Sequence, residues 1–576
     1  MKKILNILNR KQLIYFLSFG IAVLFLSIIE IFIFSLIQPM ISTLSGNNTT
    51  LDIKNNFINL FIPDKFFNSD LIIYFFFIVF ALRSVVSVAI SYIRQSLNRS
   101  IDEEVSIKLY SQYIHKDYAF FLKENSSSFV SNIIVEVDKF AYRLIDSITF
   151  FVVDVVIVGT ISIYLLINYL VPTIFLIGII GLIFSIFYLL YKNKFKQLGE
   201  NRSNADAAKV SWLQKSFYSI QSIKLDNIEN YFQEKFEKEV KKSSVNIFKM
   251  NFISELPRNL ADLILISVGA SLLYTLHSFI AIEKTLLLSV LGLFVIAMFR
   301  ILPSANRILY TFSSIKFHYR TIDVLDQLIN DKEKLNSIKS ENASPGPIII
   351  KKLITLENIT FSYDIEGKTR KILNNINLEI KKNKIIGICG KNGSGKSTLL
   401  NIITGLLDPS MGEVKLDGKS IKKFKHLYQS AIGYVTQKTY LTDDSVIENI
   451  IFGKKKLNYD QKKLQEVINV AQLGDVINDL PEKENTLLGE RGSKLSGGQQ
   501  QRIGIARALY KNPQIVIFDE ATSALDSDSQ KKILLSTVLM KSLGKTIIIV
   551  SHDEGVFEMC DEVYRIDQGT LTRLKA

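Results

Sequence analysis

Long apolar runs separated by polar, basic segments dominate the first 300 residues of this 576-residue chain. A helix crosses the hydrocarbon core of a bilayer with about 17 to 25 predominantly apolar residues. Only residues 168–171 separate the third run from the fourth, and so short a turn predicts an antiparallel pair of helices. We therefore expect a bundle of six membrane-spanning helices. The runs are 13–44, 71–92, 144–167, 172–190, 260–276 and 286–302.

Positive charge is unevenly distributed between these runs. Lysine and arginine crowd the N-terminus and the segments 94–143 and 192–258, whereas the alternate loops carry only Lys54, Lys65 and Lys284. By the positive-inside rule, we expect both termini to be cytoplasmic. This distribution accounts for the formal net charge of +14, so we expect a lipid bilayer and no nucleic acid as a partner.

The two long basic segments predict helical extensions beyond the membrane. Residues 107–121 and 205–249 are rich in helix-forming and charged residues. Residues 57–63 fit either a short amphipathic helix on the membrane surface or a plain loop.

The chain turns polar after residue 303. A charged helix is expected over 321–339, and Ser344-Pro345-Gly346-Pro347 marks a domain boundary. From residue 354 onward, short β-branched runs alternate with helical patterns, which is typical of a mixed α/β sheet. We expect a membrane α-helical bundle with long cytoplasmic extensions (1–330), a linker (331–352) and an α/β P-loop ATPase domain (353–576).

A phosphate-binding motif lies near the start of this second part. Residues 390–397 read G-K-N-G-S-G-K-S between an apolar run and a helix-like segment. Glycines let backbone N–H groups curl around a phosphate at the positive end of a helix. Lys396 can reach the β- and γ-phosphates, and Ser397 can bind Mg²⁺. The expected nucleotide-binding residues here are Gly390, Asn392, Gly393, Ser394, Gly395, Lys396, Ser397 and Thr398.

Two further motifs add the remaining chemistry. The buried run 515–520 ends in Asp519, which is expected to hold Mg²⁺, and Glu520, which is placed to polarise the water that attacks the γ-phosphate. Residues 495–499 read L-S-G-G-Q and open a helix over 500–510, a second helix start suited to an anion. A strand over 546–550 is followed by Ser551-His552.

In this order the motifs resemble the Walker A, LSGGQ and Walker B motifs of ABC transporter nucleotide-binding domains. Six spans ahead of one such domain resemble an ABC exporter half-transporter, so the resemblance covers the whole chain. It implies that Tyr363 stacks on adenine, that Gln437 binds Mg²⁺, and that the catalytic His552 contacts the γ-phosphate. The remaining nucleotide contacts that it implies are Ser496, Gly497, Gly498 and Gln499, together with Asp526 of the D-loop 523–526.

The resemblance also implies how the chain works. ATP and Mg²⁺ are the expected cofactors, and nothing in the catalytic set is missing. In this family the LSGGQ motif of one subunit completes the ATP site of the other, so we expect a homodimer. Short helices near 119–124 and 218–226 are expected to carry the motion of the ATPase domain to the bundle.

Charged residues inside the apolar runs bear on the cargo, because they are costly in a membrane unless paired or used. One interpretation is internal ion pairing, for instance Glu30 with Arg83, or the extension of terminal side chains into the interface. The other is that Arg83, Arg258 and Arg300 face a cavity and meet an anionic head group. Arginine suits phosphate because its planar guanidinium stays charged and can bind in a bidentate manner.

Residues 27–39 and 299–308 resemble the corresponding stretches of flippases of the PglK type, which move polyprenyl-pyrophosphate-linked oligosaccharides. This resemblance implies an ATP-driven flippase for a lipid-linked glycan. A peptide or bacteriocin, lipid A or a drug-like amphiphile remains an alternative cargo for the same fold. A soluble ABC ATPase of DNA repair or translation is excluded by the six apolar spans with their charge asymmetry.

Overall fold

The computed structural model describes residues 2–44, 71–279, 284–330, 351–365, 368–454, 459–521 and 526–575. Internal contacts group the chain into two compact units. The first lies within residues 1–116 and 123–339, and the second lies within 117–122 and 340–576.

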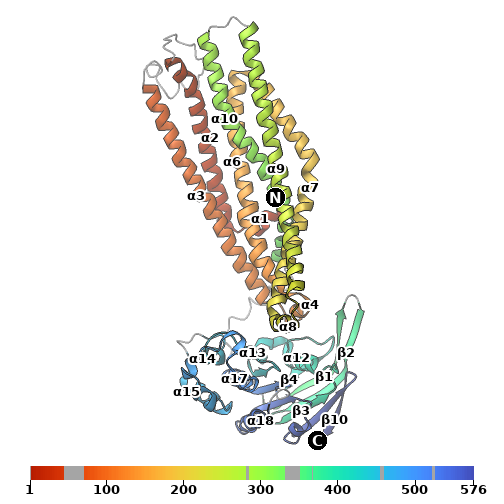
Figure 1. Cartoon of the computed structure of the whole chain (residues 1–576). Coiled ribbons are helices and arrows are strands. Elements are labelled where there is room, and N and C mark those ends of the chain that lie inside the picture. Colours follow the sequence, from red (N-terminus) through yellow and green to blue (C-terminus); the bar gives the residue numbers. More distant parts are fainter. Residues whose placement is uncertain are drawn as a thin grey trace. The chain divides into compact units, whose positions relative to one another are not determined.

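The first unit is entirely helical where it is described, and its long helices run alongside one another (Figure 1). Six of them, α2, α3, α6, α7, α9 and α10, carry the six predicted apolar runs. The elements are α1 (Lys2–Ile7), α2 (Arg10–Leu44), α3 (Leu71–Ile114), α5 (Ser126–Ser131), the π-helical turns η2 (Asn132–Glu136) and η3 (Lys139–Ile145), α6 (Asp146–Asn168), α7 (Leu170–Tyr218), α8 (Ile220–Asp226), α9 (Glu229–Phe279), α10 (Lys284–Phe317) and α11 (Tyr319–Asn330). The short helix α4 (Tyr118–Lys123) is grouped, except for Lys123, with the second unit.

The outer faces of these helices are apolar. On α2, large apolar side chains recur every three or four residues and are 48–68% exposed. Such a continuous exposed stripe is unfavourable in water and suits contact with lipid tails. The α2 stripe consists of Ile14, Leu17, Ile21, Leu24, Phe25 and Ile28. Among the described residues, four helical stretches are long and apolar enough to cross a membrane: Arg10–Ile37, Ile72–Ile114, Ser126–Asn168 and Gly292–Phe317.

The helical extensions are less continuous than the sequence predicts. The helix expected over 107–121 is broken, because α3 ends at Ile114 and α4 begins at Tyr118. The helix expected over 205–249 is divided among α7, α8 and α9. The second break, between α8 and α9, lies at Asn227, which adopts a left-handed conformation (φ 53°). Short helices do occur near 119–124 and 218–226, as α4 and α8. Residues 57–63 lie outside the described residues. The same is true of residues 331–339, the last part of the helix expected over 321–339.

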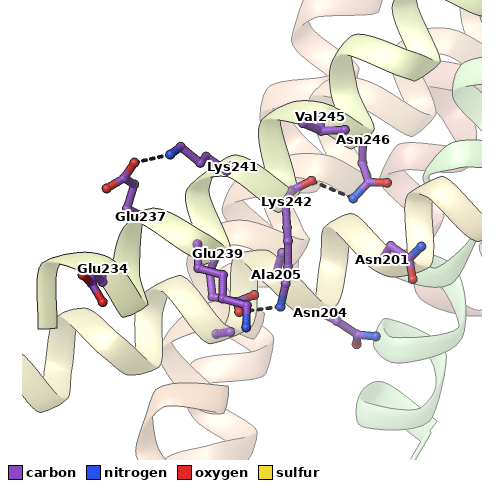
Figure 2. Close-up of a pocket in the computed structure, with 12 residues that line it drawn as sticks. Asn201, Asn204, Ala205, Glu234, Glu237, Glu239, Lys241, Lys242, Val245 and Asn246 are labelled. Atoms are coloured by element: carbon purple, nitrogen blue, oxygen red, sulfur yellow. Dashed lines mark hydrogen bonds and ion pairs between the residues drawn. The ribbon is translucent and has the colours of Figure 1, made fainter. Parts of the chain in front are cut away.

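The polar parts of α7 and α9 border a cavity of about 1030 Å³ (Figure 2). Its walls are charged, and most of the charges are paired along α9. Lys242 contacts Glu239 at 2.6 Å, and Lys241 contacts Glu237. Neither Arg83 nor Arg300 lines this cavity.

The second unit contains two sheets. Antiparallel strands form the smaller sheet, in the order β2-β1-β4-β5, and the larger sheet has the order β10-β9-β3-β8-β7-β6. The strands are β1 (Leu353–Ile365), β2 (Lys368–Lys381), β3 (Ile385–Gly390), β4 (Met411–Leu416), β5 (Lys419–Ser420), β6 (Ile432–Val435), β7 (Ile515–Asp519), β8 (Thr546–Val550), β9 (Glu562–Asp567) and β10 (Thr570–Lys575). The helices are α12 (Lys396–Ile403), α13 (Lys425–Ser430), α14 (Val446–Ile450), α15 (Gln461–Val470), α16 (Gly474–Asn478), α17 (Gly497–Tyr510), α18 (Ser527–Ser542) and α19 (Glu554–Phe557), with short 3₁₀ turns at Ile421–Phe424, Lys483–Asn485 and Glu490–Gly492.

The central strands of the larger sheet explain where its functional loops lie. β3, β7 and β8 are parallel neighbours made almost entirely of buried apolar residues, because a parallel sheet is covered on both faces. Parallel strands end at the same edge of the sheet. The segments that follow β3, β7 and β8, which carry the glycine loop, Glu520 and His552, are therefore brought together there.

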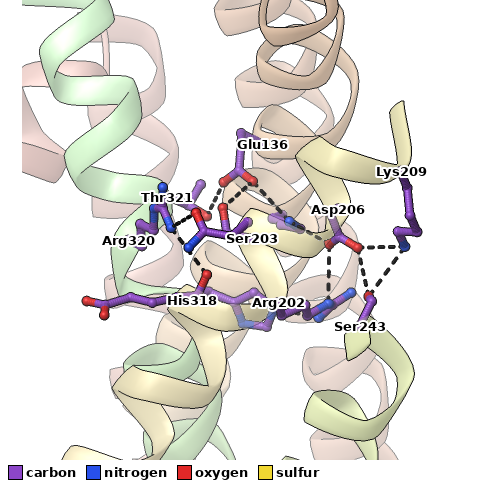
Figure 3. A network of polar contacts seen from close by, with 12 residues as sticks. Glu136, Arg202, Ser203, Asp206, Lys209, Ser243, His318, Arg320 and Thr321 are labelled. Atoms are coloured by element: carbon purple, nitrogen blue, oxygen red, sulfur yellow. Dashed lines mark hydrogen bonds and ion pairs between the residues drawn. The ribbon is translucent and has the colours of Figure 1, made fainter. Parts of the chain in front are cut away.

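A buried polar network joins five helical segments of the first unit (Figure 3). Glu136 accepts hydrogen bonds from Lys139 at 2.9 Å, Ser203 at 3.1 Å and Thr321 at 2.7 Å. Lys139 also contacts Asp206, 2.9 Å away. Burial opposes the charge of Asp206, but the nearby ammonium of Lys139 and the hydrogen bonds that the carboxylate accepts lower its pKa to about 2. The network therefore fixes η2, η3, α7, α9 and α11 to one another through paired charges.

His318 lies at the edge of this network, between α10 and α11. Its Nδ1 lies 2.9 Å from the carbonyl oxygen of Ser314, and its side chain is buried beside Arg202. Burial and the charge of Arg202 lower the pKa of His318 to about 3. The folded unit therefore holds His318 neutral at every pH near neutrality.

This shift predicts acid sensitivity. Between about pH 6.5 and pH 3 the unfolded chain binds a proton at His318 that the folded chain does not, so the free energy of unfolding falls as the pH is lowered. We expect His318→Gln to reduce the loss of melting temperature between pH 7.5 and pH 5, measured in detergent by intrinsic fluorescence.

His115→Gln is the matched control, because the His115 Nδ1 also contacts the carbonyl oxygen four residues earlier but its side chain is exposed. An equal effect of the two substitutions would contradict the assignment to His318.

Candidate functional site

The glycine loop after β3 has a backbone that only glycine adopts easily. Gly390, Gly393 and Gly395 have φ values of 156°, 78° and 108°. A Cβ at Gly390 would collide with the carbonyl oxygen of Ile566, and a Cβ at Gly395 would lie 2.8 Å from the Leu373 side chain. The loop therefore presents bare backbone at the start of α12, as a phosphate-binding cradle requires.

Side chains in the loop also suit an anion. The Ser394 hydroxyl is buried and has no hydrogen-bond partner among the described residues. The Lys396 ammonium is almost fully buried and donates to the carbonyl oxygens of Gly390 at 2.9 Å and Lys391 at 3.2 Å. Both groups point into the loop. Asn392 and Ser397 are exposed beside it, and Thr398 is buried on α12.

Glu520 follows β7 and is contacted by side chains from three other segments. His552 Nε2 lies 2.9 Å from its Oε1, the Gln437 amide donates to its Oε2 at 3.0 Å, and Lys396 Nζ is 3.5 Å from Oε1. Glu520 has a φ of 53°, a left-handed conformation that is uncommon for a residue other than glycine. Such backbone strain is concentrated at functional sites, where the surrounding structure holds it.

Asp519 lies beside Glu520 and is half-buried. Burial raises the pKa of Asp519, and the neighbouring charge of Glu520 adds to this, whereas a hydrogen bond from Tyr434 opposes it. The Asp519 carboxylate, the Ser397 hydroxyl and the Gln437 amide carry oxygen atoms of the hard type that Mg²⁺ prefers. Their chemistry therefore fits the Mg²⁺ site that the sequence predicts.

The LSGGQ residues form a helix start elsewhere on this unit. Ser496 is the N-cap of α17, and its backbone N–H donates to the Gln499 side chain at 2.9 Å while its hydroxyl accepts from the Gln499 backbone N–H at 3.4 Å. The described hydrogen bonds of the Ser496 and Gln499 side chains stay within this capping box. Gly497 and Gly498 form the first turn of the helix.

Two other predicted residues lie outside the cluster around Glu520. Tyr363 is on β1 and packs edge-on against Phe361, with 4.9 Å between the ring centroids. Asp526 caps α18, where its carboxylate accepts from the Ser529 backbone N–H at 3.0 Å. Residues 523–525 of the D-loop lie outside the described residues.

The structure adds two residues that the sequence motifs did not single out. The Tyr434 hydroxyl donates to Asp519 Oδ2 at 2.8 Å. Gln501 on α17 donates to the backbone carbonyl oxygens of Thr436, at 3.0 Å, and of Gln437. The sequence could have indicated these two residues only by their closeness to the predicted motifs. Tyr434 is three residues before Gln437, and Gln501 is two residues after Gln499.

Two buried carboxylates of the membrane unit, Glu30 and Asp154, are paired with arginines. The buried Glu30 carboxylate lies 2.8 Å from Arg83 and also contacts Arg300. Its side chain is 2% exposed, whereas those of Arg83 and Arg300 are 16% and 32% exposed. Arg307 pairs with the buried Asp154 at 2.5 Å. The structure thus contains the predicted pair between Glu30 and Arg83. The Arg258 side chain lies outside the described residues.

Comparison with known protein families matches both parts of the chain. The family description "ABC transporter transmembrane region" matches residues 15–302, half of the chain, and the description "ABC transporter" matches residues 373–523. The chain belongs to the ABC transporter family. It combines a helical membrane domain with one ABC ATPase domain, as the sequence predicts.

The relatives match different shares of this chain. The "ATP-dependent lipid A-core flippase" of Pseudoalteromonas translucida is 40% identical over 225 residues, which cover 38% of this chain and 38% of that protein. The "Multidrug resistance-like ATP-binding protein MdlA" of Buchnera aphidicola is 28% identical over 482 residues, 82% of this chain and 80% of that protein. Several matches cover only a small part of the relative's own length. The match to the "ABC transporter B family member 1" of Arabidopsis thaliana, for example, covers 17% of that protein.

The fold also matches a solved structure of a bacterial Atm1-family ABC exporter with ATP bound. The TM-score is 0.76 at 20% sequence identity, and the match covers 98% of this chain and 94% of the other. The likeness therefore establishes the fold of an ABC exporter.

The contacts of Glu520 predict how a substitution separates binding from hydrolysis. Glu520→Gln keeps the shape of the side chain but removes its charge and basicity, so we expect ATP hydrolysis to fall about 10²- to 10³-fold while ATP affinity changes little. Phosphate release and fluorescent-nucleotide binding measure the two effects.

Glu554→Gln is the matched control, since Glu554 is an exposed carboxylate two residues beyond His552. Similar losses in both variants would argue against a specific role of Glu520.

Proposed function

We propose that this ABC transporter hydrolyses ATP to flip a polyprenyl-pyrophosphate-linked oligosaccharide across the bacterial cytoplasmic membrane. The observation that carries the cargo assignment is the cluster of Glu30, Arg83 and Arg300. It holds two guanidinium groups against one carboxylate, so the cluster has an excess positive charge within the membrane unit. A pyrophosphate group would complement that charge.

The cluster differs from the second pair in a way that supports this assignment. Arg307 and Asp154 form an ion pair with no net charge, so a structural role is sufficient to explain it. Arg83 and Arg300 instead share the single carboxylate of Glu30. Arg258 belongs to this proposal from the sequence only.

The ATP site supports hydrolysis through residues of this chain. The glycine loop and Lys396 would hold the phosphates, and Glu520 would accept a hydrogen bond from the attacking water while His552 and Gln437 keep its carboxylate in place. Tyr363 would stack on the adenine ring. Mg²⁺ would supply positive charge at the phosphate oxygens, held by Ser397, Gln437 and Asp519.

A second copy of the chain would complete the ATP sites. The hydrogen bonds of Ser496 and Gln499 stay within their own helix start, so this helix start remains available to the phosphates of another subunit. We therefore propose a homodimer with two equivalent ATP sites and, from the distribution of basic residues, with both termini in the cytoplasm. A monomeric mass for the active, detergent-solubilised protein would contradict the dimer.

Flipping in proteoliposomes tests the function directly. With a fluorescent polyprenyl-pyrophosphate oligosaccharide in the membrane, we expect ATP to deplete the label from the accessible leaflet, and we expect Glu520→Gln to abolish this movement. Protein that hydrolyses ATP without moving the label would overturn the cargo assignment. Lipid A, which the name of one relative suggests, and then peptides and drug-like amphiphiles would be the cargoes to assay next.

The arginine cluster predicts a separation of transport from hydrolysis. Arg83→Ala and Arg300→Ala each leave Glu30 with one partner, so we expect the fold to persist, transport to fall about tenfold or more, and basal ATP hydrolysis to stay within about twofold. A charged hydrogen bond contributes about 1.5–3 kcal/mol, which sets this scale.

Arg307→Ala is the control for this pair of variants, because it leaves the buried Asp154 without its paired arginine. We expect it to reduce both activities and the yield of folded protein. Equal losses of transport and hydrolysis in Arg83→Ala or Arg300→Ala would indicate that those arginines, like Arg307, stabilise the fold and do not bind cargo.

A further inference from the structure

The two carboxylates at the end of β7 each accept a hydrogen bond from the segment that contains β6. The Tyr434 hydroxyl donates to Asp519 Oδ2 at 2.8 Å, and the Gln437 amide donates to Glu520 Oε2 at 3.0 Å. Gln437 belongs to the motif set expected from the sequence. Tyr434 does not, yet it contacts the carboxylate expected to bind the metal.

The position of Tyr434 is fixed by the sheet. β6 and β7 are parallel neighbours, with Tyr434 opposite Ile517 and Val435 opposite Phe518. Val435 is 1% exposed, which anchors the strand, and the ring of Tyr434 packs against the apolar cluster beneath the sheet. A tyrosine has only two side-chain torsions, so a packed ring holds its hydroxyl in a defined place.

The hydrogen bond from this hydroxyl also restricts the carboxylate of Asp519. A carboxylate has two oxygens, and a donor fixed on Oδ2 sets the plane of the group and the direction of Oδ1. Partners of this kind orient metal ligands, and their loss commonly costs about 10- to 100-fold in metal affinity.

We propose that Tyr434 is a positioning residue for Mg²⁺ in the ATP site, which acts by orienting the Asp519 carboxylate toward the metal. This inference rests on the proposed hydrolysis of Mg²⁺-bound ATP. It predicts that Tyr434 governs how tightly the metal is held and leaves the binding of metal-free nucleotide unchanged.

The test is the conservative variant Tyr434→Phe in the full-length protein. Mn²⁺ serves as the metal probe, and its binding is measured by electron paramagnetic resonance with a non-hydrolysable ATP analogue. We expect the dissociation constant for Mn²⁺ to rise about tenfold, while the affinity for the analogue in EDTA stays the same. The Mg²⁺ concentration that gives half-maximal hydrolysis should rise by a similar factor, with little change in the maximal rate.

Tyr428→Phe is the matched control. Tyr428 is a fully buried tyrosine of the same unit, and its hydroxyl donates to the carbonyl oxygen of Ile403 at 2.7 Å. The same atom is deleted there, away from any carboxylate, so a general loss of stability would appear in both variants. An equal weakening of Mn²⁺ binding in Tyr428→Phe, or unchanged binding in Tyr434→Phe, would overturn the inference.

A double variant tests whether Tyr434 acts through Asp519. If it does, Tyr434→Phe should add little to the loss of Mn²⁺ affinity caused by Asp519→Asn, and fully additive losses would overturn the proposal. Wild-type protein whose nucleotide binding does not depend on any metal, and which hydrolyses no ATP, would overturn the proposed function and this inference together. Normal metal dependence in the wild type with no effect of Tyr434→Phe would overturn this inference alone.

Discussion

The arrangement of the ATP site depends on one carboxylate, that of Glu520. Lys396, His552 and Gln437 reach it from the segments that follow β3, β8 and β6, so the group links four separate parts of the ATPase unit. The contact is possible because these strands are parallel and end at one edge of the larger sheet. Glu520 keeps a left-handed backbone there, and the surrounding contacts hold this unfavourable conformation.

The membrane unit meets a different constraint, which is the cost of charge away from water. Its charged side chains satisfy this constraint by pairing, both in the span region, where Asp154 meets Arg307, and in the extension, where Asp206 meets Lys139. In the cluster around Glu30, which lies in the span region, one carboxylate serves two arginines. Excess charge in a costly place is the physical basis for assigning an anionic cargo to this cluster.

Much of this architecture follows from local sequence patterns. The apolar runs were long enough to identify the membrane helices, and the all-apolar strands β3, β7 and β8 were identified together with the motifs that follow them. The short helices near 119–124 and 218–226 were expected, but the positions of the breaks after Ile114 and Tyr218 were not, because helix propensity is a weak signal and packing decides where a helix ends. The pairing of Arg300 with Glu30 also escaped the analysis, since 270 residues separate the two along the chain.

The sequence by itself determined the family and the order of the two parts, and it predicted the phosphate-binding residues. These features rest on periodicity and on short motifs, in which neighbours along the chain act together. Only the tertiary structure decided which side chains support those motifs. Tyr434 reaches Asp519, and Glu136 reaches Thr321, through contacts between residues 85 and 185 positions apart. Such contacts depend on strand register and helix packing, and no local pattern of hydrophobic and polar residues specifies them.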